Sequence, residues 1–213
     1  EFFIQAETER QPVSVLGTLI DDQGTIILPG PAIQPSVAPD QLKDFKVYRP
    51  GSTESADAVY LGQDAYTGWH FIRVEQKLRG ELVPITKYAH IATDPSLSEE
   101  LWGIGLRNKD EDFLPYFLSS RVATVMKIPQ KTAITASDLA GPGLPVFNAA
   151  GEFAGLALPS FGQNFLVFSQ HQHGTPIMLV NVEESSAVLL ADEVLPYLKR
   201  IPQSVTGRPV RWL

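Results

Sequence analysis

Apolar residues along the chain fall in short runs that are rich in Val, Ile, Leu, Phe and Tyr. Pro and Gly are spread between these runs rather than pooled in one linker. Short apolar runs separated by frequent turn signals predict an all-β sandwich or barrel. The expected strands of the first half are 12–20, 24–28, 44–49, 56–62, 69–75 and 81–87. Those of the second half are 101–107, 116–127, 145–148, 152–158, 164–170, 176–181 and 187–191.

Two stretches have the composition of β-hairpins and fall at similar places in the two halves. They read IDDQGTI (20–26) and FNAAGEF (147–153). Each has an acidic or amide residue, then a glycine where positive φ is required, then a returning strand. The repetition predicts two related six-stranded units, divided within 88–99.

The last regular element is predicted to be a short helix, DEVLPYLKRI (192–201). Acidic residues in its first turn and basic residues in its last suit the helix dipole, although Pro196 limits it. The expected fold is therefore all-β, with two six-stranded antiparallel β-barrels and a C-terminal helix. The predicted boundaries are an N-terminal segment 1–11, a first barrel 12–88, a linker 89–99, a second barrel with the helix 100–203, and a further linker 204–213.

Composition narrows the function classes. The net charge is −7 and no basic stripe is present, so nucleic acid is not expected as a partner. No apolar run approaches the ~20 residues of a membrane-spanning helix. The chain has no cysteine, which excludes disulfides, thiol nucleophiles and thiolate metal sites. No cofactor is expected.

Four motifs then occur in a recognisable order, and a fifth follows at the end of the chain. They are GTLIDDQGTIIL (17–28), GQDAYTGWHFIRV (62–74), GPGLPVFNAAGEFAGLAL (141–158), SSAVLLADEVLPYLKRI (185–201) and GRPVRWL (207–213). Together they resemble the HtrA/Deg-type trypsin-like serine proteases, in which the same hairpins, final strand and helix lead into a PDZ domain. The resemblance implies a trypsin-like double barrel over about residues 12–213, and a PDZ domain would follow it.

The resemblance fails at the three catalytic positions. Counted from the matching residues, the catalytic His falls on Pro31, the Asp on Gly68 and the Ser on Pro142. A slip of a residue or so restores nothing, because no His occurs in 1–69 and no Ser lies within four residues of Pro142.

The chemistry of the replacing residues agrees with this loss. A serine protease needs a hydroxyl, a base, a carboxylate that orients the base, and backbone N–H groups aimed at the oxyanion. Proline has no N–H, so Pro142 removes both the nucleophile and an oxyanion donor. The run from Pro29 to Pro31 is also expected to disfavour the short helical turn that carries the family's His.

The leading hypothesis is a non-catalytic domain, not an enzyme, that binds peptides or proteins or acts as a scaffold. Regulation of an active protease or of envelope protein quality control is a role of that kind. The resemblance implies an exported bacterial protein, periplasmic or extracellular. Leu158, Pro159, Ser160 and Phe161 match the family's substrate-pairing strand and are the predicted edge of a peptide groove, by β-augmentation.

Two other functions remain open. One is a hydrolase with a displaced constellation, Ser137 or Ser160 with His70, His90 or His171. The other is a purely structural oligomerisation or spacer role. Against the hydrolase, a histidine on an apolar strand is usually a packed or surface residue.

Several other residues that could be functional also have a simpler structural explanation. The SD pair at 137–138 more often bonds nearby backbone amides in a polar loop. On a strand, His171 and His173 would both lie on the same face, where two imidazoles can hold a metal ion. No third ligand is evident, so no metal site is predicted. Phe2 and Phe3 are candidates for packing on the first barrel or for building a homo-oligomer, a trimer by resemblance.

Overall fold

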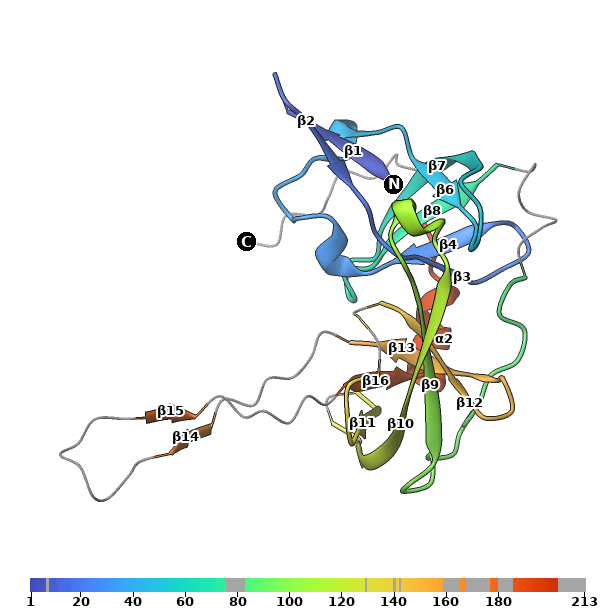
Figure 1. The fold of residues 1–213 in the computed structure, drawn as a ribbon, viewed down its shortest axis with the longest axis vertical. Helices are drawn as coiled ribbons and strands as arrows, with labels where there is room; N and C mark the ends of the chain where they lie inside the picture. The colour runs from blue at the N-terminus through green and yellow to red at the C-terminus, as the bar shows by residue number, and fades with distance from the viewer. Residues whose placement is uncertain are drawn as a thin grey trace.

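The computed structural model describes residues 1–6, 8–75, 83–128, 130–139, 141, 143–158 and 186–202, and the backbone of 165–167 and 177–179. Two β units lie one above the other, with the C-terminal helix beside the lower one (Figure 1). The lower, second unit is a closed six-stranded barrel in the order β10-β11-β16-β13-β12-β9. Its strands are β9 (Glu100–Leu106), β10 (Pro115–Met126), β11 (Thr132–Thr135), β12 (Pro145–Asn148), β13 (Phe153–Ala157) and β16 (Ala187–Leu190).

The alternation of side chains along β9 shows how this barrel is filled. Leu101 points inward and is fully buried, whereas its neighbour Trp102 is exposed. Because successive strand residues point to opposite faces, one strand supplies both the core and the outer surface. Val146, Val188 and Leu190 join Leu101 in the core of the barrel.

The first unit consists of two sheets that share a core. A five-stranded sheet has the order β3-β4-β8-β7-β6, and a three-stranded sheet has the order β2-β1-β5. The strands are β1 (Phe2–Gln5), β2 (Arg10–Val13), β3 (Thr18–Leu19), β4 (Thr25–Leu28), β5 (Leu42–Lys43), β6 (Lys46–Tyr48), β7 (Ser55–Gln63) and β8 (His70–Val74). Main-chain hydrogen bonds of 2.8 and 2.9 Å between Glu1 and Lys46 link the two sheets. The five-stranded sheet is thus a half-barrel, completed by the other sheet instead of being closed by a continuous ladder.

Several expected strands differ in the structure. The run 12–20 is interrupted between β2 and β3, where Ser14–Gly17 belongs to neither sheet. The prediction of a strand at 81–87 is wrong for its described part, because residues 83–87 are irregular. Pro84 has no N–H to donate to a ladder, and Tyr88 forms only an isolated bridge with Phe153.

In the second half, the expected strands 164–170 and 176–181 correspond to β14 (Phe165–Val167) and β15 (Ile177–Leu179). These two strands pair with each other and stand outside the barrel (Figure 1). The barrel reaches six strands through β11, which the sequence did not indicate. The segment 1–11, taken as separate from the first barrel, supplies β1 and the start of β2.

Both predicted hairpin turns are present. Gly24 and Gly151 have φ of +77° and +74°, the left-handed region that favours glycine. In the first turn, Asp21 Oδ1 accepts a hydrogen bond from the Thr25 N–H at 2.8 Å. In the second, Asn148 Oδ1 accepts from the main chain two and four residues later. The acidic or amide residue in each motif therefore fixes the turn.

A hydrophobic cluster joins the two units and the helix. From the first unit come Ile20, Ile27, Leu61, Trp69 and Phe71, and from the second come Phe153, Leu156, Leu189, Ala191 and Val194. The helix α2 (Ala191–Leu198) follows β16 directly and packs Tyr197 edge-on against Trp69, with ring centroids 5.6 Å apart. It begins one residue before the prediction and ends two residues after Pro196, three residues short of the predicted end.

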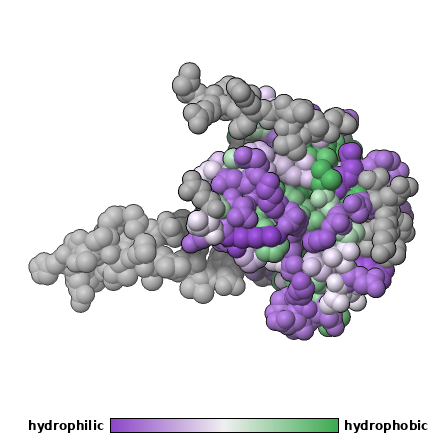
Figure 2. Space-filling model, turned by 90° about the horizontal axis from the view of Figure 1, so that it is seen from above, coloured by the Kyte–Doolittle hydropathy of each residue, from purple (hydrophilic) through white to green (hydrophobic). Residues whose placement is uncertain are grey.

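Three short 3₁₀ turns complete the described elements: η1 (Gly30–Ala32), η2 (Pro39–Gln41) and η3 (Lys109–Glu111). Within the described residues, the one α-helix is far too short to cross a bilayer, and no other helix is long and apolar enough to do so. Seen from the end that carries the first unit, the described surface is mainly hydrophilic, with a hydrophobic patch framed by hydrophilic residues (Figure 2).

Candidate functional site

Pro31, the first of the three positions where the resemblance predicts a catalytic residue, lies exposed in the 3₁₀ turn η1, one residue after β4. The expectation that the prolines would disfavour a helical turn here is therefore wrong. Pro29 is the extended residue before the turn, with φ −64° and ψ 144°. Pro31 sits in the first turn, where its missing N–H would have no intrahelical partner. A short helical turn is therefore present at the position where the resemblance predicts a catalytic His, and Pro31 occupies it.

The second position, Gly68, is held by a turn that begins at Asp64. The buried carboxylate of Asp64 accepts hydrogen bonds from the main chain of Tyr66 and Thr67 and from the Thr67 hydroxyl, at 2.8–3.1 Å. Thr67 Oγ1 in turn accepts from the Trp69 N–H at 3.1 Å. Asp64 and Thr67 therefore fix the backbone of this turn through their side chains. Gly68 has φ +71°, so an aspartate at 68 would be strained.

The first two positions lie against each other across the end of the half-barrel. A Cβ added to Gly30 would be 3.0 Å from the carbonyl oxygen of Gly68. The side-chain amide of Gln63 also donates to that oxygen, at 3.0 Å. The backbone of η1 therefore rests directly on Gly68, and no carboxylate occupies this contact.

Pro142 itself is outside the described residues, but its neighbour Gly143 touches the same turn. A Cβ on Gly143 would lie 2.6 Å from Cβ of Pro29, which shows how closely the loop backbone approaches the Pro29 ring. The Gly143 N–H donates to the Ala157 carbonyl at 2.7 Å, and the Thr18 hydroxyl donates to the Gly143 carbonyl at 3.4 Å. The fold thus brings together the segments that flank all three positions.

A buried histidine lies beneath this meeting point. His70 is on β8, opposite Leu28 of β4, and its Nδ1 is 2.8 Å from the hydroxyl of Tyr60. Burial lowers the pKa of His70 below its ordinary value, and hydrogen bonds to the backbone of Gly30 and Ile33 partly offset this. Burial also raises the pKa of Tyr60, to about 12. His70 is therefore a packed, neutral core histidine that supports η1.

This arrangement predicts a pH-dependent stability. Because the pKa of His70 is lower in the folded chain than its ordinary 6.5, the unfolded chain binds more protons. The His70 contribution is complete above pH 6.5 and is lost as the pH falls below it. Urea unfolding between about pH 8 and pH 5 should show a flatter dependence for His70→Gln than for the parent chain. Equal slopes for the parent and His70→Gln would contradict the assignment.

The proposed displaced nucleophile Ser137 has other partners. Its hydroxyl lies 2.8 Å from that of Ser120, which also accepts from the Ser137 N–H. Asp138 Oδ1 accepts from the Leu139 N–H at 2.9 Å and from the Ser186 hydroxyl at 2.6 Å. These bonds match the reading of a polar loop that satisfies nearby backbone amides.

The remaining candidates are separate from this site or outside the described residues. His90 bonds Glu99 at 2.6 Å in the linker between the units. Leu158 is half-buried, and its N–H donates to the Ala187 carbonyl at 2.7 Å. The rest of the predicted groove edge (159–161, which includes Ser160), His171 and His173 are not described. Among the described residues, no group of three or more His, Asp or Glu is placed to hold a metal ion.

The two N-terminal aromatic rings pack on their own unit. Phe2 is buried and stacks on Phe45, with ring centroids 4.9 Å apart. Phe3 is half-buried, and the Arg10 guanidinium lies 3.9 Å from the centroid of its ring.

The closed six-stranded barrel, the half-barrel and the short C-terminal helix together make a trypsin-like double β-barrel. No protein-family model and no curated protein sequence matches this chain. Comparison with known structures gives 255 matching chains. One is Rv3671c from M. tuberculosis H37Rv, crystallised in an inactive form as a serine-to-alanine mutant. It matches 97% of this chain and 88% of its own at a TM-score of 0.61, and the 11% sequence identity establishes similarity of fold alone.

Proposed function

We propose that this chain is a non-catalytic trypsin-like domain that binds peptides or proteins or serves as a scaffold. The contact that carries the proposal is the one between Gly143 and Pro29, because the backbone of Gly143 lies directly on that ring. In a serine protease, this junction is where a nucleophile and its base must share a proton. Here the described side of the junction holds a proline ring and a glycine backbone.

The acid–base groups near the junction support the same conclusion. His70 is buried, faces the hydroxyl of Tyr60 and supports the backbone of the turn. Oδ2 of Asp64 accepts three hydrogen bonds within its own turn. Both side chains are thus engaged by partners in their own turn or sheet, and neither is paired with a catalytic base or nucleophile among the described residues.

The wider role follows the resemblance to HtrA/Deg-type proteases. We place the chain in an exported bacterial protein, periplasmic or extracellular, ahead of a PDZ domain. Its partners would be extended peptides or proteins, among them an active protease that it regulates, and a homo-oligomer fits the same resemblance. A purely structural spacer is the second candidate, favoured by the packing of Gly143 on Pro29, which fills this part of the junction.

The lack of activity is tested with the purified chain, unfolded casein and a fluorophosphonate probe. We expect no cleavage and no labelling, with trypsin as the positive control. The combined variant Pro31→His, Gly68→Asp, Pro142→Ser should also stay inactive. An aspartate is strained at φ +71°, and the Gly143 backbone remains packed on Pro29. Labelling of the parent chain that is lost in His70→Gln or Ser137→Ala would instead establish a displaced hydrolase.

A peptide-display selection on the parent chain separates binding from a spacer role. The comparison variant is Leu158→Glu, at the described end of the predicted groove edge, and the matched control is Val59→Glu on the exposed face of β7. Enriched peptides that bind the parent and Val59→Glu but not Leu158→Glu would support the binding module. Failure to enrich any sequence would favour the spacer.

A further inference from the structure

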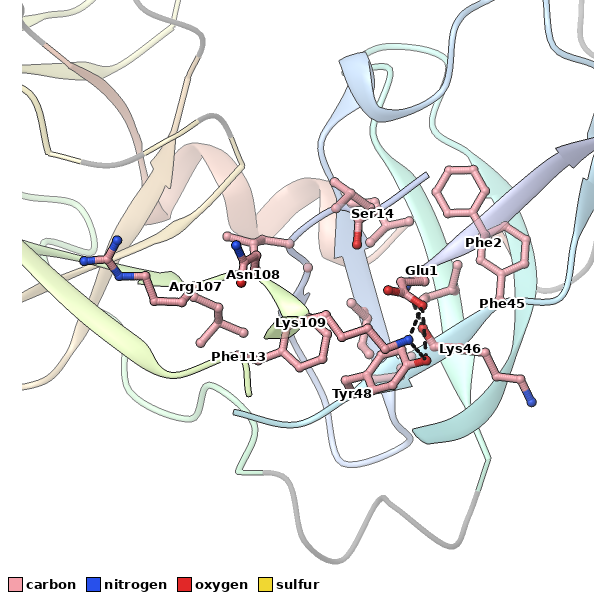
Figure 3. A pocket seen from close by; sticks show the side chains of 18 residues that line it. Glu1, Phe2, Ser14, Phe45, Lys46, Tyr48, Arg107, Asn108, Lys109 and Phe113 are labelled. Carbon is pink, nitrogen blue, oxygen red and sulfur yellow. Dashed lines mark hydrogen bonds and ion pairs between the residues drawn. The ribbon is translucent and has the colours of Figure 1, made fainter. Parts of the chain in front are cut away.

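The first unit contains a cavity of about 350 Å³ at the place where its two sheets fail to close. One wall is the Ser14–Gly17 segment that joins β2 to β3, and the opposite wall is β6 with the residue before it, Phe45. A loop of the second barrel, 106–109 with Phe113, covers the opening (Figure 3). The volume lies within the range of small-molecule sites, about 300–1,000 Å³.

The gap between the two sheets, called the seam from here on, stays open because residues 14–17 pair with neither sheet. Pairing of β2 with β1 ends at Val13, and pairing of β3 with β4 begins at Thr18. A Cβ on Gly17 would lie 2.5 Å from Cγ2 of Ile26, so the chain crosses closely over β4 at this glycine. A gap is therefore left between the crossing segment and β6.

The inner part of the cavity is apolar. Its lining includes side chains of the first unit's core, namely Phe2, Ile26, Leu28, Phe45 and Ile72. Val15, Leu16 and Val47 contribute half-buried walls. An apolar ligand body that entered the seam would extend this core and remove further apolar surface from water.

The rim carries one side-chain cation, Lys109, that is directed to the cavity side. Lys109 Nζ is 3.2 Å from Glu1 Oε2 and 3.1 Å from the Tyr48 hydroxyl (Figure 3). The side chains of Lys46 and Arg107 point away from this cluster in the same view. Lys46 pairs with Asp57, and the Arg107 guanidinium lies 5.5 Å from the Tyr116 ring centroid.

The remaining hydrogen-bonding capacity of the rim is mainly donor capacity. An ammonium has three N–H groups, and two of those of Lys109 are accounted for by Glu1 and Tyr48. Asn108 uses its side-chain oxygen to accept from the Glu111 N–H at 3.1 Å, which leaves its NH₂ group as a donor. The Ser14 hydroxyl is a further lining group. Lys109 and the Glu1 carboxylate balance each other's charge, so it is the unused donors of Lys109, Asn108 and Ser14 that suit this rim to the oxygens of an anion.

We propose that this seam binds an amphipathic monocarboxylate, with the apolar body inside the first unit and the carboxylate at Lys109, Asn108 and Ser14. The ligand would touch the half-barrel and the η3 loop of the second barrel together, and so would stabilise their contact. The site is independent of the proposed non-catalytic role, because neither Pro29–Gly30, Gly68 nor Gly143 lines the cavity.

The test uses dodecanoate, dodecanol and acetate with the full chain, at concentrations below micelle formation, by calorimetry. Dodecanoate should bind and acetate should not. Lys109→Met should weaken dodecanoate binding about tenfold or more, the scale of one lost charge-assisted bond, and leave dodecanol binding unchanged. Lys127→Met, which removes an exposed lysine paired with Asp94 on the second barrel, is the matched control and should bind as the parent does.

Two further measurements locate the ligand. When dodecanoate is added, the amide chemical shifts of residues 15–17 and of Tyr48 should change. The variant Val15→Trp should fill the seam and abolish binding, while its circular dichroism spectrum stays that of the parent chain. The proposal is overturned if dodecanoate does not bind, if Lys109→Met binds it as tightly as the parent, or if the shifts cluster at the exposed Trp102 of the second barrel.

Discussion

Replacing Gly155 by alanine should unfold the second barrel or lower its free energy of unfolding by more than about 4 kcal/mol. A Cβ at this position would lie 2.0 Å from the Leu189 carbonyl oxygen and 3.0 Å from a Val188 side-chain carbon. The first of these atoms is backbone, in the ladder that pairs β13 with β16. Relief would require the two strands to separate, which would break the closed barrel. Urea unfolding followed by far-UV circular dichroism measures the loss.

The matched control is Gly151→Ala. Gly151 has φ +74°, but a Cβ there would meet no atom within 4 Å, so only backbone strain is added. A cost of about 1–2 kcal/mol is expected for alanine in the left-handed region. If the two variants lost the same stability, the close approach of β13 to β16 would be refuted.

Phe71→Ala is expected to cost about 3–5 kcal/mol, the usual range for removing a buried phenylalanine. Phe71 has no exposed surface and belongs to the cluster that joins the first unit, the second barrel and α2. Removing the Phe71 ring leaves a cavity where the two units pack together. Neither unit can fill this cavity without shifting its own packed side chains. Thermal and urea unfolding should still show one transition, at a lower midpoint.

Phe117→Ala on the outer face of β10 serves as the comparison. Phe117 is 59% exposed, so its truncation should change stability by no more than about 1 kcal/mol. Equal losses in Phe71→Ala and Phe117→Ala, or an unchanged Phe71→Ala chain, would mean that the two units are not held together through this cluster.

The sequence predicted most strands because their signals are local. In β9, Leu101 and Trp102 alternate between core and surface, and in the two hairpins Asp21 and Asn148 accept bonds from backbone a few residues away. The prediction of a strand at 81–87 was wrong in its described part because it relied on the apolar residues of this run. Pro84 has no N–H to donate to a ladder and should have counted against it. β11 was missed because its TAIT segment is short and follows β10 closely, and its other partner, β16, lies much later in the chain.

The candidate site shows the same division. The sequence assigned positions 31 and 68 by counting from local motifs, and the structure shows that Asp64 and Thr67 of one such motif form a local turn. The Tyr60–His70 pair was not foreseen, although antiparallel pairing of β7 with β8 makes cross-strand contacts of this kind regular. The contact of Gly143 with Pro29 had no local signal, because it joins two units.

The sequence by itself determined the double-β architecture, the hairpin turns, the position of the helix and the absence of His, Asp and Ser at three positions. These properties follow from residue type and from spacing within a few residues. Only the tertiary structure decided that η1 forms despite its prolines, that His70 is buried beneath it, and that the first unit closes through two sheets with an open seam. Each depends on packing between segments far apart in the chain, where contacts over long separations outweigh local preference.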